Sequence, residues 1–156
     1  MLVLILFAVL TIAPSQRHRP VLTPIDRAAL AELLDQAHLA ELGRSPGRAR
    51  LQMALAVIRW ENGNGDKVYL HNLGNLGAPT GEPYYVDSGG YYAAFPDFGA
   101  AARAFWRHLD THCARALRWF DAGDTRESAS ALKRCGYFAA PLDQYEAGLQ
   151  RLLRHD

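Results

Sequence analysis

The stretch QMALAVIRWENGNGDKVYLHNLGNLG, residues 52–77, determines how the rest of this chain is interpreted. Its first half carries apolar residues at helical spacing, which predicts a buried helix from about Arg48 that ends at Glu61 or Asn62. Its second half is rich in glycine and asparagine, which readily adopt positive φ, so residues 62–81 are expected to form an irregular loop. A carboxylate therefore stands where a buried helix gives way to a loop.

Glu61 is placed beside Trp60, at the end of an apolar helix stripe. A carboxyl group held against apolar groups has its charged form disfavoured, so its pKa rises and it keeps its proton closer to neutral pH. This is the property that a general acid needs. The alternative is an ordinary glutamate at a helix C-terminus, but the helix dipole disfavours negative charge there. Glu61 is therefore a candidate catalytic acid.

Regular elements are predicted on both sides of this stretch. Before it, a helix begins with Thr23 as N-cap and Pro24 in its first turn, and Gly43 ends it. After it, residues 83–86 and 91–95 are short aromatic-rich runs around a glycine-containing turn, which predicts a β-hairpin.

Further helices are predicted towards the C-terminus. One long helix follows Asp97 and ends at Gly123, a short one opens with a capping box at residues 124–127, and a last one begins near Pro141 and extends to Leu153. The whole pattern predicts a mostly α-helical α+β fold with one small β-hairpin lobe.

The bulk properties fit one domain preceded by a leader. The chain has 156 residues and a formal net charge of +1, which argues against a nucleic-acid binder. Residues 1–13 are apolar, too few for a membrane span but long enough for the core of a signal peptide. We expect residues 1–19 to be a signal-like or anchor leader, residues 20–156 to be the domain, and the protein to be exported. The alternative is an N-terminal helix or strand packed on the domain.

Metal and cofactor sites are not predicted. His108 and His112 are four residues apart on one helix face, but no third ligand is indicated, so two half-exposed histidines are the simpler interpretation. Cys113 and Cys135 form a disulfide if the protein is exported and remain thiols if it is not. The spacing of the two cysteines leaves both possibilities open.

Several motifs resemble one enzyme family. Glu61, Gly63 and Gly65 match a pattern E-x-G-x-G, and an N-x-G-N loop follows at residues 72–75. Downstream, YYAAFPDFGAAARAFWRHL at 91–109 and LKRCGYFAAPLDQYEAGLQRLL at 132–153 resemble the hairpin, the next helix and the closing segment of that family. The chain thus resembles, over about residues 48–153, the peptidoglycan glucosaminidases of flagellar and autolysin type. It departs from them in lacking a tryptophan after the glutamate and the threonine of the closing segment.

The resemblance implies a lysozyme-like fold and cleavage of peptidoglycan glycan strands. The bond would be the β-1,4 linkage between N-acetylglucosamine and N-acetylmuramic acid, with Glu61 as general acid, no cofactor, and the chain acting as a monomer. Muramidase or lytic transglycosylase activity is the alternative within the same superfamily. A non-catalytic wall-binding module is the alternative from another class.

A second carboxylate would stabilise the transition state or activate water, and the hairpin lobe is where we expect it. Asp87 is the first candidate and Glu82 the second. Asp87 is equally well explained as a turn residue that bonds its own backbone.

Five residues are predicted to contact the sugar chain: Trp60, Asn72, Asn75, Tyr92 and Tyr137. The asparagines would bond N-acetyl groups or hydroxyls, although asparagine also supplies left-handed turn conformations. The tyrosines would face the cleft, Tyr137 by resemblance and Tyr92 as a hairpin residue suited to stacking on a pyranose. Each could instead serve the core or the strand.

Overall fold

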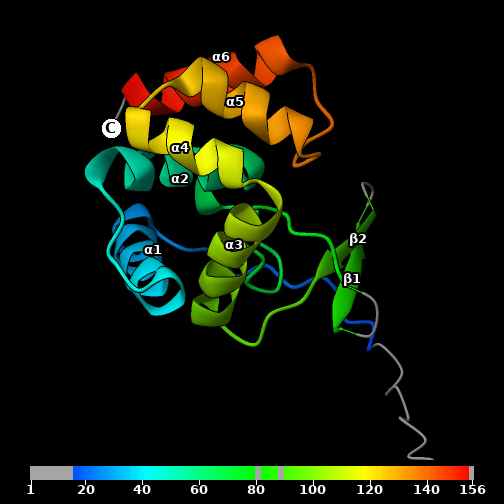
Figure 1. Cartoon of the computed structure of the whole chain (residues 1–156). Coiled ribbons are helices and arrows are strands. Elements are labelled where there is room, and N and C mark those ends of the chain that lie inside the picture. The colour runs from blue at the N-terminus through cyan, green and yellow to red at the C-terminus, as the bar shows by residue number, and fades with distance from the viewer. Residues whose placement is uncertain (1–15, 80–81, 88–89, 155–156) are drawn as a thin grey trace, which may run out of the picture.

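The computed structural model describes residues 16–79, 82–87 and 90–154, and the predicted α+β organisation is confirmed there (Figure 1). Residues 1–15, the larger part of the predicted leader, lie outside the described residues. The elements are α1 (Arg27–Leu42), α2 (Arg48–Glu61), the 3-10 turn η1 (Gly63–Gly65), β1 (Tyr84–Asp87), β2 (Gly90–Ala93), α3 (Phe98–His112), α4 (Ala114–Ala122), α5 (Thr125–Arg134) and α6 (Leu142–Arg154).

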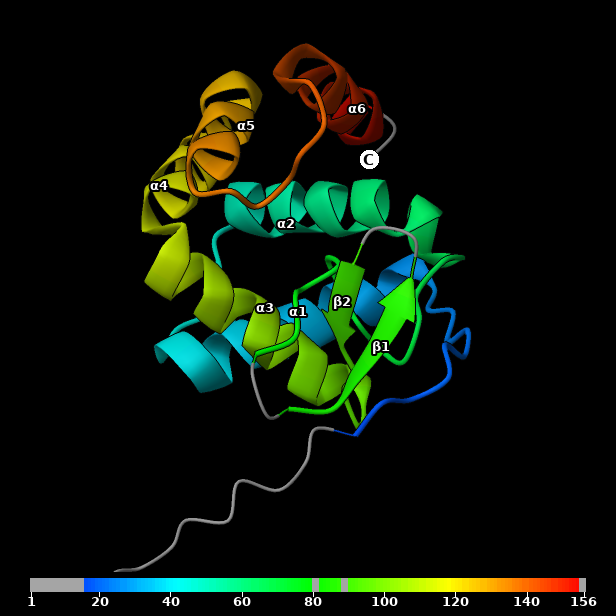
Figure 2. The ribbon, with the colours of Figure 1, turned by 90° about the vertical axis from the view of Figure 1, so that its right-hand side faces the viewer.

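Helix α2 lies at the centre of the helical body. It crosses the molecule between α1 and α3 on one side and α4, α5 and α6 on the other (Figure 2). Residues 53–58 are all buried, which is why this helix was recognisable as an apolar stripe. It packs against α1, α4 and α6. The predicted helix from Arg48 to Glu61 is confirmed, and it carries Glu61 to the edge of the core.

The predicted long helix between Asp97 and Gly123 is instead two helices. Cys113 leaves helical geometry with φ −124° and ψ 28°, ending α3 and preceding α4. The break lets α3 pack on α1 while α4 packs on α2 and α5, which one straight helix could not do. Cys113 is bonded to Cys135, so the disulfide left open by the sequence is present. It ties the start of α4 to the end of α5.

The first helix begins later than predicted. Asp26, not Thr23, is the N-cap of α1, and its carboxylate accepts a hydrogen bond from the backbone N–H of Ala29 at 3.0 Å. Thr23 belongs to an extended segment before the helix. Its backbone N–H donates to the Val68 carbonyl at 2.8 Å, and its hydroxyl accepts from the His71 N–H at 2.8 Å. The threonine therefore holds the loop after α2 rather than capping a helix.

The hairpin is held at its outer edge by the N-terminal segment. Strands β1 and β2 are antiparallel, with Tyr85 opposite Tyr92. Tyr84 of β1 donates its N–H to the Gln16 carbonyl at 3.0 Å and accepts from the His18 N–H at 2.7 Å. Gln16 and His18, in the segment predicted as part of the leader, therefore pair with β1 through their backbone, whereas the apolar run at residues 1–13 lies outside the described residues.

Within the described ranges, no helix is both long enough and apolar enough to span a bilayer.

Candidate active site

The loop after α2 is organised by Asn62, which is 1% exposed. Its side-chain oxygen accepts from the Gly74 N–H at 3.0 Å, and its amide nitrogen donates to Oδ1 of Asn75 at 3.2 Å. Asn62 is also the C-cap of α2. One side chain therefore links the end of the helix to residues twelve and thirteen positions further on.

Asn75 contacts Glu61 directly. Its amide nitrogen donates to the Glu61 backbone carbonyl at 2.9 Å and lies 3.4 Å from Oε2 of the Glu61 carboxyl group. The residue has φ 52°, the left-handed conformation that asparagine tolerates better than most residues. The expected left-handed turn conformation is therefore present, and the contact of Asn75 with sugar remains a prediction. Asn75 positions Glu61 and lines the same cavity.

Asn72 has a different place from the one predicted. It is 0% exposed, and its side chain bonds the backbone of Leu76 in both directions and the carbonyl of Ala93. These bonds use both amide hydrogens and one acceptor position of the carbonyl oxygen, and the side chain is fully enclosed, so a substrate does not reach it. The prediction of direct sugar contact by Asn72 is corrected: it joins the loop to strand β2.

The carboxyl group of Glu61 is largely removed from water. Its Oε1 is fully enclosed and has no hydrogen-bond partner of regular geometry. Burial raises the pKa of Glu61, and weaker contributions from the hydroxyl of Tyr145 and the amide of Asn75 lower it, leaving it above its usual value. Tyr145 makes no hydrogen bond of regular geometry either, so we interpret its contact with Glu61 as close but poorly aligned. No cation is among the causes of the shift.

A cavity of about 230 Å³ opens at Glu61. Of the predicted site residues, Trp60, Asn75, Tyr92 and Tyr137 line it together with Glu61. Tyr92 comes from the hairpin and the other aromatic residues from the helical body or the 137–140 segment, so the cavity lies where the two parts meet. The remaining lining residues are Phe138, Ala139, Ala140 and Tyr145.

Tyr137 forms one wall of the cavity and is held there by a hydrogen bond. Its hydroxyl donates to the Gly74 carbonyl at 2.9 Å. Gly74 has φ 76°, and a Cβ at this position would overlap the tyrosine hydroxyl, so both the conformation and the contact require glycine. Burial, followed by the charge of Glu61, raises the pKa of Tyr137 well above its usual value, so the hydroxyl stays protonated.

Trp60 is positioned by a close contact with α6. A Cβ on Gly148 would overlap the indole ring, so glycine is needed for this approach. The ring of Trp60 also makes an edge contact with Tyr145, with centroids 6.2 Å apart. Helix α6 therefore contributes the ring of Tyr145 to the cavity and holds the ring of Trp60.

The second carboxylate is not brought into this cavity. Asp87 ends β1 on the exposed side of the hairpin, and Glu82 lines a different pocket. Among the described residues that line the cavity, Glu61 is the only carboxylate.

His108 and His112 are neighbours, with ring centroids 4.9 Å apart in a stacked arrangement. In the described part of the chain, no group of three or more histidine, cysteine or acidic side chains could hold a metal ion.

Two residues of this site were missed at the level of sequence. The sequence analysis assigned Asn62 only to the end of the helix. It assigned Tyr145 to the core face of the last helix and to the closing segment of the resemblance, without a role at the site. The closing segment, in which Tyr145 follows Tyr137 by eight positions, was the available signal.

The chain was also compared with known proteins. No protein-family model, no curated protein and no solved structure matches it.

Proposed function

We propose that this chain is a peptidoglycan glycosidase with a lysozyme-like fold, in which Glu61 is the general acid. The observation that carries the proposal is a carboxyl group with a raised pKa at the edge of the helical body, in a cavity lined by aromatic side chains. Aromatic rings suit sugar faces, and a protonated carboxyl is what a glycosidic oxygen needs as it leaves. The resemblance of residues 48–153 to peptidoglycan glucosaminidases points to the same chemistry.

The reaction follows from these groups. Glu61 transfers its proton to the glycosidic oxygen as the bond from that oxygen to the anomeric carbon breaks, leaving an oxocarbenium-like sugar and a glutamate anion. In hydrolysis, water then adds to the anomeric carbon, and the proton that it loses returns to Glu61. Asn75 holds the carboxyl group through the backbone and Oε2 contacts described above. Trp60 and Tyr92 line the same cavity and would contact the sugars there. The favoured reaction is that of a glucosaminidase, in which the bond at the anomeric carbon of N-acetylglucosamine is cleaved.

A lytic transglycosylase is the second candidate, because Glu61 is the only carboxylate among the described residues that line the cavity. Hydrolysis needs a group that activates water or stabilises the cation. In transglycosylation a hydroxyl of the muramic acid itself attacks the anomeric carbon and returns its proton to Glu61, giving an anhydro-sugar end. This route requires no second carboxylate.

Export of the protein is part of the proposal. The disulfide between Cys113 and Cys135 supports it, because disulfides persist mainly in oxidising compartments. The substrate also lies outside the cytoplasm.

The test is release of soluble fragments from purified peptidoglycan by the full chain and by Glu61→Gln. We expect the variant to lose at least about 100-fold in rate, the usual contribution of a general acid. Glu32→Gln on the exposed face of α1 is the matched control and should keep the activity.

Mass spectrometry of the fragment ends separates the candidates. A reducing N-acetylglucosamine end indicates the glucosaminidase, a reducing muramic acid end the muramidase, and an anhydro end the transglycosylase. If the folded protein binds peptidoglycan but releases no fragments, the enzyme proposal is wrong, and the chain is a wall-binding module.

A further inference from the structure

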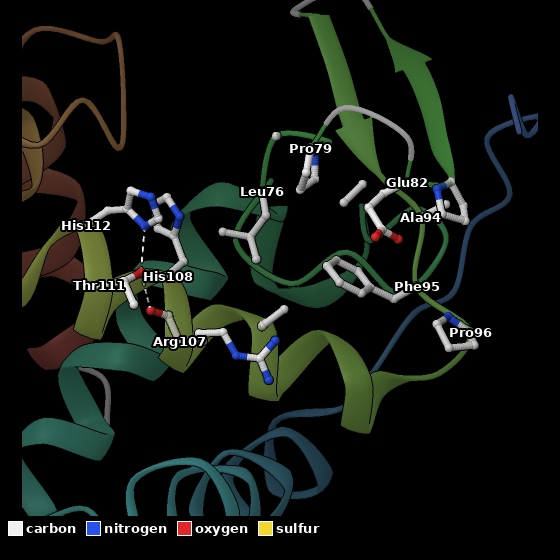
Figure 3. A pocket seen from close by; sticks show the side chains of 14 residues that line it. Leu76, Pro79, Glu82, Ala94, Phe95, Pro96, Arg107, His108, Thr111 and His112 are labelled. Atoms are coloured by element: carbon white, nitrogen blue, oxygen red, sulfur yellow. Dashed lines mark hydrogen bonds between the residues drawn. The ribbon is translucent and has the colours of Figure 1, made fainter. Parts of the chain in front are cut away.

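A second and larger pocket lies beside the Glu61 cavity (Figure 3). Its volume is about 620 Å³, within the range of pockets that enclose a small organic ligand. Helix α3 forms one wall, and two segments before it form the others. The residues of α3 in this wall are Ala104, Arg107, His108, Thr111 and His112, and those of the other walls are Leu76, Gly77, Pro79, Glu82, Pro83 and residues 93–96. None of its lining residues belongs to the Glu61 cavity.

The two pockets are lined by residues that are in contact or consecutive in the chain. Tyr137 in the wall of the Glu61 cavity contacts His108 in the wall of the larger pocket, with ring centroids 5.9 Å apart. Asn75 and Leu76 are consecutive residues that line different pockets, and so are Tyr92 and Ala93. A ligand bound at Glu61 therefore has the larger pocket directly beside it.

The walls of this pocket are poorly suited to a sugar. They consist largely of carbon, with proline, alanine and leucine side chains and only one aromatic residue, Phe95, outside the histidines. A pyranose needs many hydrogen-bond partners for its hydroxyls, since buried polar groups are costly without them. Small apolar side chains instead favour a ligand that carries methyl groups.

Charged and polar groups gather on two sides of the pocket. Arg107, His108 and His112 are on α3, whereas Glu82 lies across the opening on the chain that leads into the hairpin (Figure 3). Nε and one terminal nitrogen of Arg107 bond the two oxygens of the Glu41 carboxylate at 2.6 and 3.0 Å, which leaves the other terminal nitrogen of this largely exposed side chain for a ligand. The pocket thus offers donors to a carboxylate on one side and an acceptor to an amine on the other.

We propose that this pocket binds the short peptide that the lactyl group of muramic acid carries. Such peptides combine alanine methyl groups with carboxylates and, in many walls, with the free amine of a diamino acid. The methyl groups match the alanine and proline walls, the carboxylates match the side formed by α3, and the amine matches Glu82. This inference rests on the proposed function and makes the enzyme selective for glycan strands that still carry their peptides.

Filling the pocket tests the proposal. Ala104→Leu adds side-chain volume to the α3 wall, and Ala122→Leu, at an exposed position on α4, is the matched control. Fragment release is measured with the full chain on intact peptidoglycan and on the same glycan stripped of peptides by an amidase. We expect Ala104→Leu to lose about tenfold in kcat/KM on the intact substrate only, an effect of about 1.4 kcal/mol. Equal activity of the wild type on both substrates, or equal loss on both, would overturn the proposal.

A binding measurement keeps this result separate from the proposed activity. A soluble muramyl peptide is titrated into the wild type, Ala104→Leu and Arg107→Gln, the last of which changes an exposed side chain and leaves the core intact. Weaker binding by both variants supports the pocket even if no glycan is cleaved. Unchanged binding by both folded variants, or no binding to the wild type, overturns it whatever the activity.

Discussion

At the scale of single residues, Glu61 is governed by opposing effects. Burial raises its pKa, while Tyr145 and Asn75 lower it, and burial has the larger effect. The proton is therefore retained to higher pH than in an exposed glutamate, but two neighbours prevent the shift from growing further. The pH at which a general acid loses its proton sets the alkaline limit of the reaction. This limit should respond to each neighbour in a known direction.

Tyr145→Phe should move the alkaline limit of activity to higher pH. The substitution removes the hydroxyl that lowers the pKa of Glu61 and keeps the ring, so the protonated acid persists further. The measurement is kcat against pH on peptidoglycan. Tyr137→Phe is the control, because its hydroxyl bonds the Gly74 carbonyl and is not among the groups that lower this pKa. A limit that moves down, or moves equally in the control, would contradict the assignment.

Glu61→Gln should stabilise the fold at neutral pH while removing activity. The pKa of Glu61 in the folded state lies above its usual value of 4.5, so the wild type loses stability as the pH rises through the folded pKa and the buried group ionises. Glutamine avoids this cost. We expect a higher Tm than the wild type at pH 7, with a difference that shrinks towards pH 4, where both side chains are neutral. A difference independent of pH would indicate packing rather than charge.

At the scale of elements, the sequence predicted a helix or strand correctly where one local signal dominates. The apolar stripe of α2 and the turn signals of the hairpin were sufficient to predict both. The break at Cys113 was not visible, because residues on both sides continue one helical pattern and the bend follows from packing against different partners. Thr23 and Asp26 are both good N-caps, and only the tertiary contacts of Thr23 separate them.

The loop after α2 shows the same limit on what the sequence can predict about the site. The asparagines of this loop predicted residues with positive φ and polar contacts, and Asn64 and Asn75 do have positive φ. Which asparagine reaches Glu61 and which bonds the backbone depends on how the loop folds back, so Asn72 and Asn75 could not be distinguished in advance. Glu61 itself was predictable, because its environment follows from the apolar stripe of its own helix.

Thr23→Val should destabilise the protein through the loop that positions the site. Valine keeps the shape of threonine but removes the oxygen that accepts from the His71 N–H, leaving that donor without its partner. We expect a loss of about 0.5–1.5 kcal/mol in the free energy of unfolding, the usual net contribution of one hydrogen bond, because this bond is only partly buried. Thr23→Ser retains the hydroxyl and serves as the control. Urea unfolding curves measure both, and equal losses would show that the methyl group matters instead.

At the scale of the whole molecule, a polar network around the buried side chains of Arg50 and His38 joins three helices away from the Glu61 cavity and reaches the surface at Asp121. Arg50 of α2, 5% exposed, bonds Asp121 of α4 at 2.7 Å through Nε and lies 3.0 Å from Nε2 of His38 on α1. Nδ1 of His38 lies 2.6 Å from the Arg44 carbonyl. The neutral tautomer with its proton on Nδ1 fits both contacts, because Nε2 then accepts from Arg50. None of these residues lines the cavity.

Protonation of His38 should therefore weaken the fold in mild acid. Burial has the largest effect in lowering the pKa of His38, and the charges of Arg50 and Arg44 lower it further, whereas the Arg44 carbonyl and Asp121 oppose them. Because the folded pKa is below the usual 6.5, stability is complete above that pH and is lost as the pH falls through the folded pKa. We expect the Tm to decline with acidification in this range. His38→Gln, which cannot take up a proton, should start lower at pH 7 and decline less.

The two buried groups together bound the working range of the molecule. Acid keeps the proton on Glu61 but charges His38, so the pH that favours the chemistry approaches the pH that loosens α1, α2 and α4. We expect the acid limit of fragment release in prolonged assays to move to lower pH in His38→Gln at a temperature where that variant remains folded, and the alkaline limit to stay unchanged. Movement of the alkaline limit would couple the network to Glu61, and an unmoved acid limit would assign that limit to a group in the cavity instead.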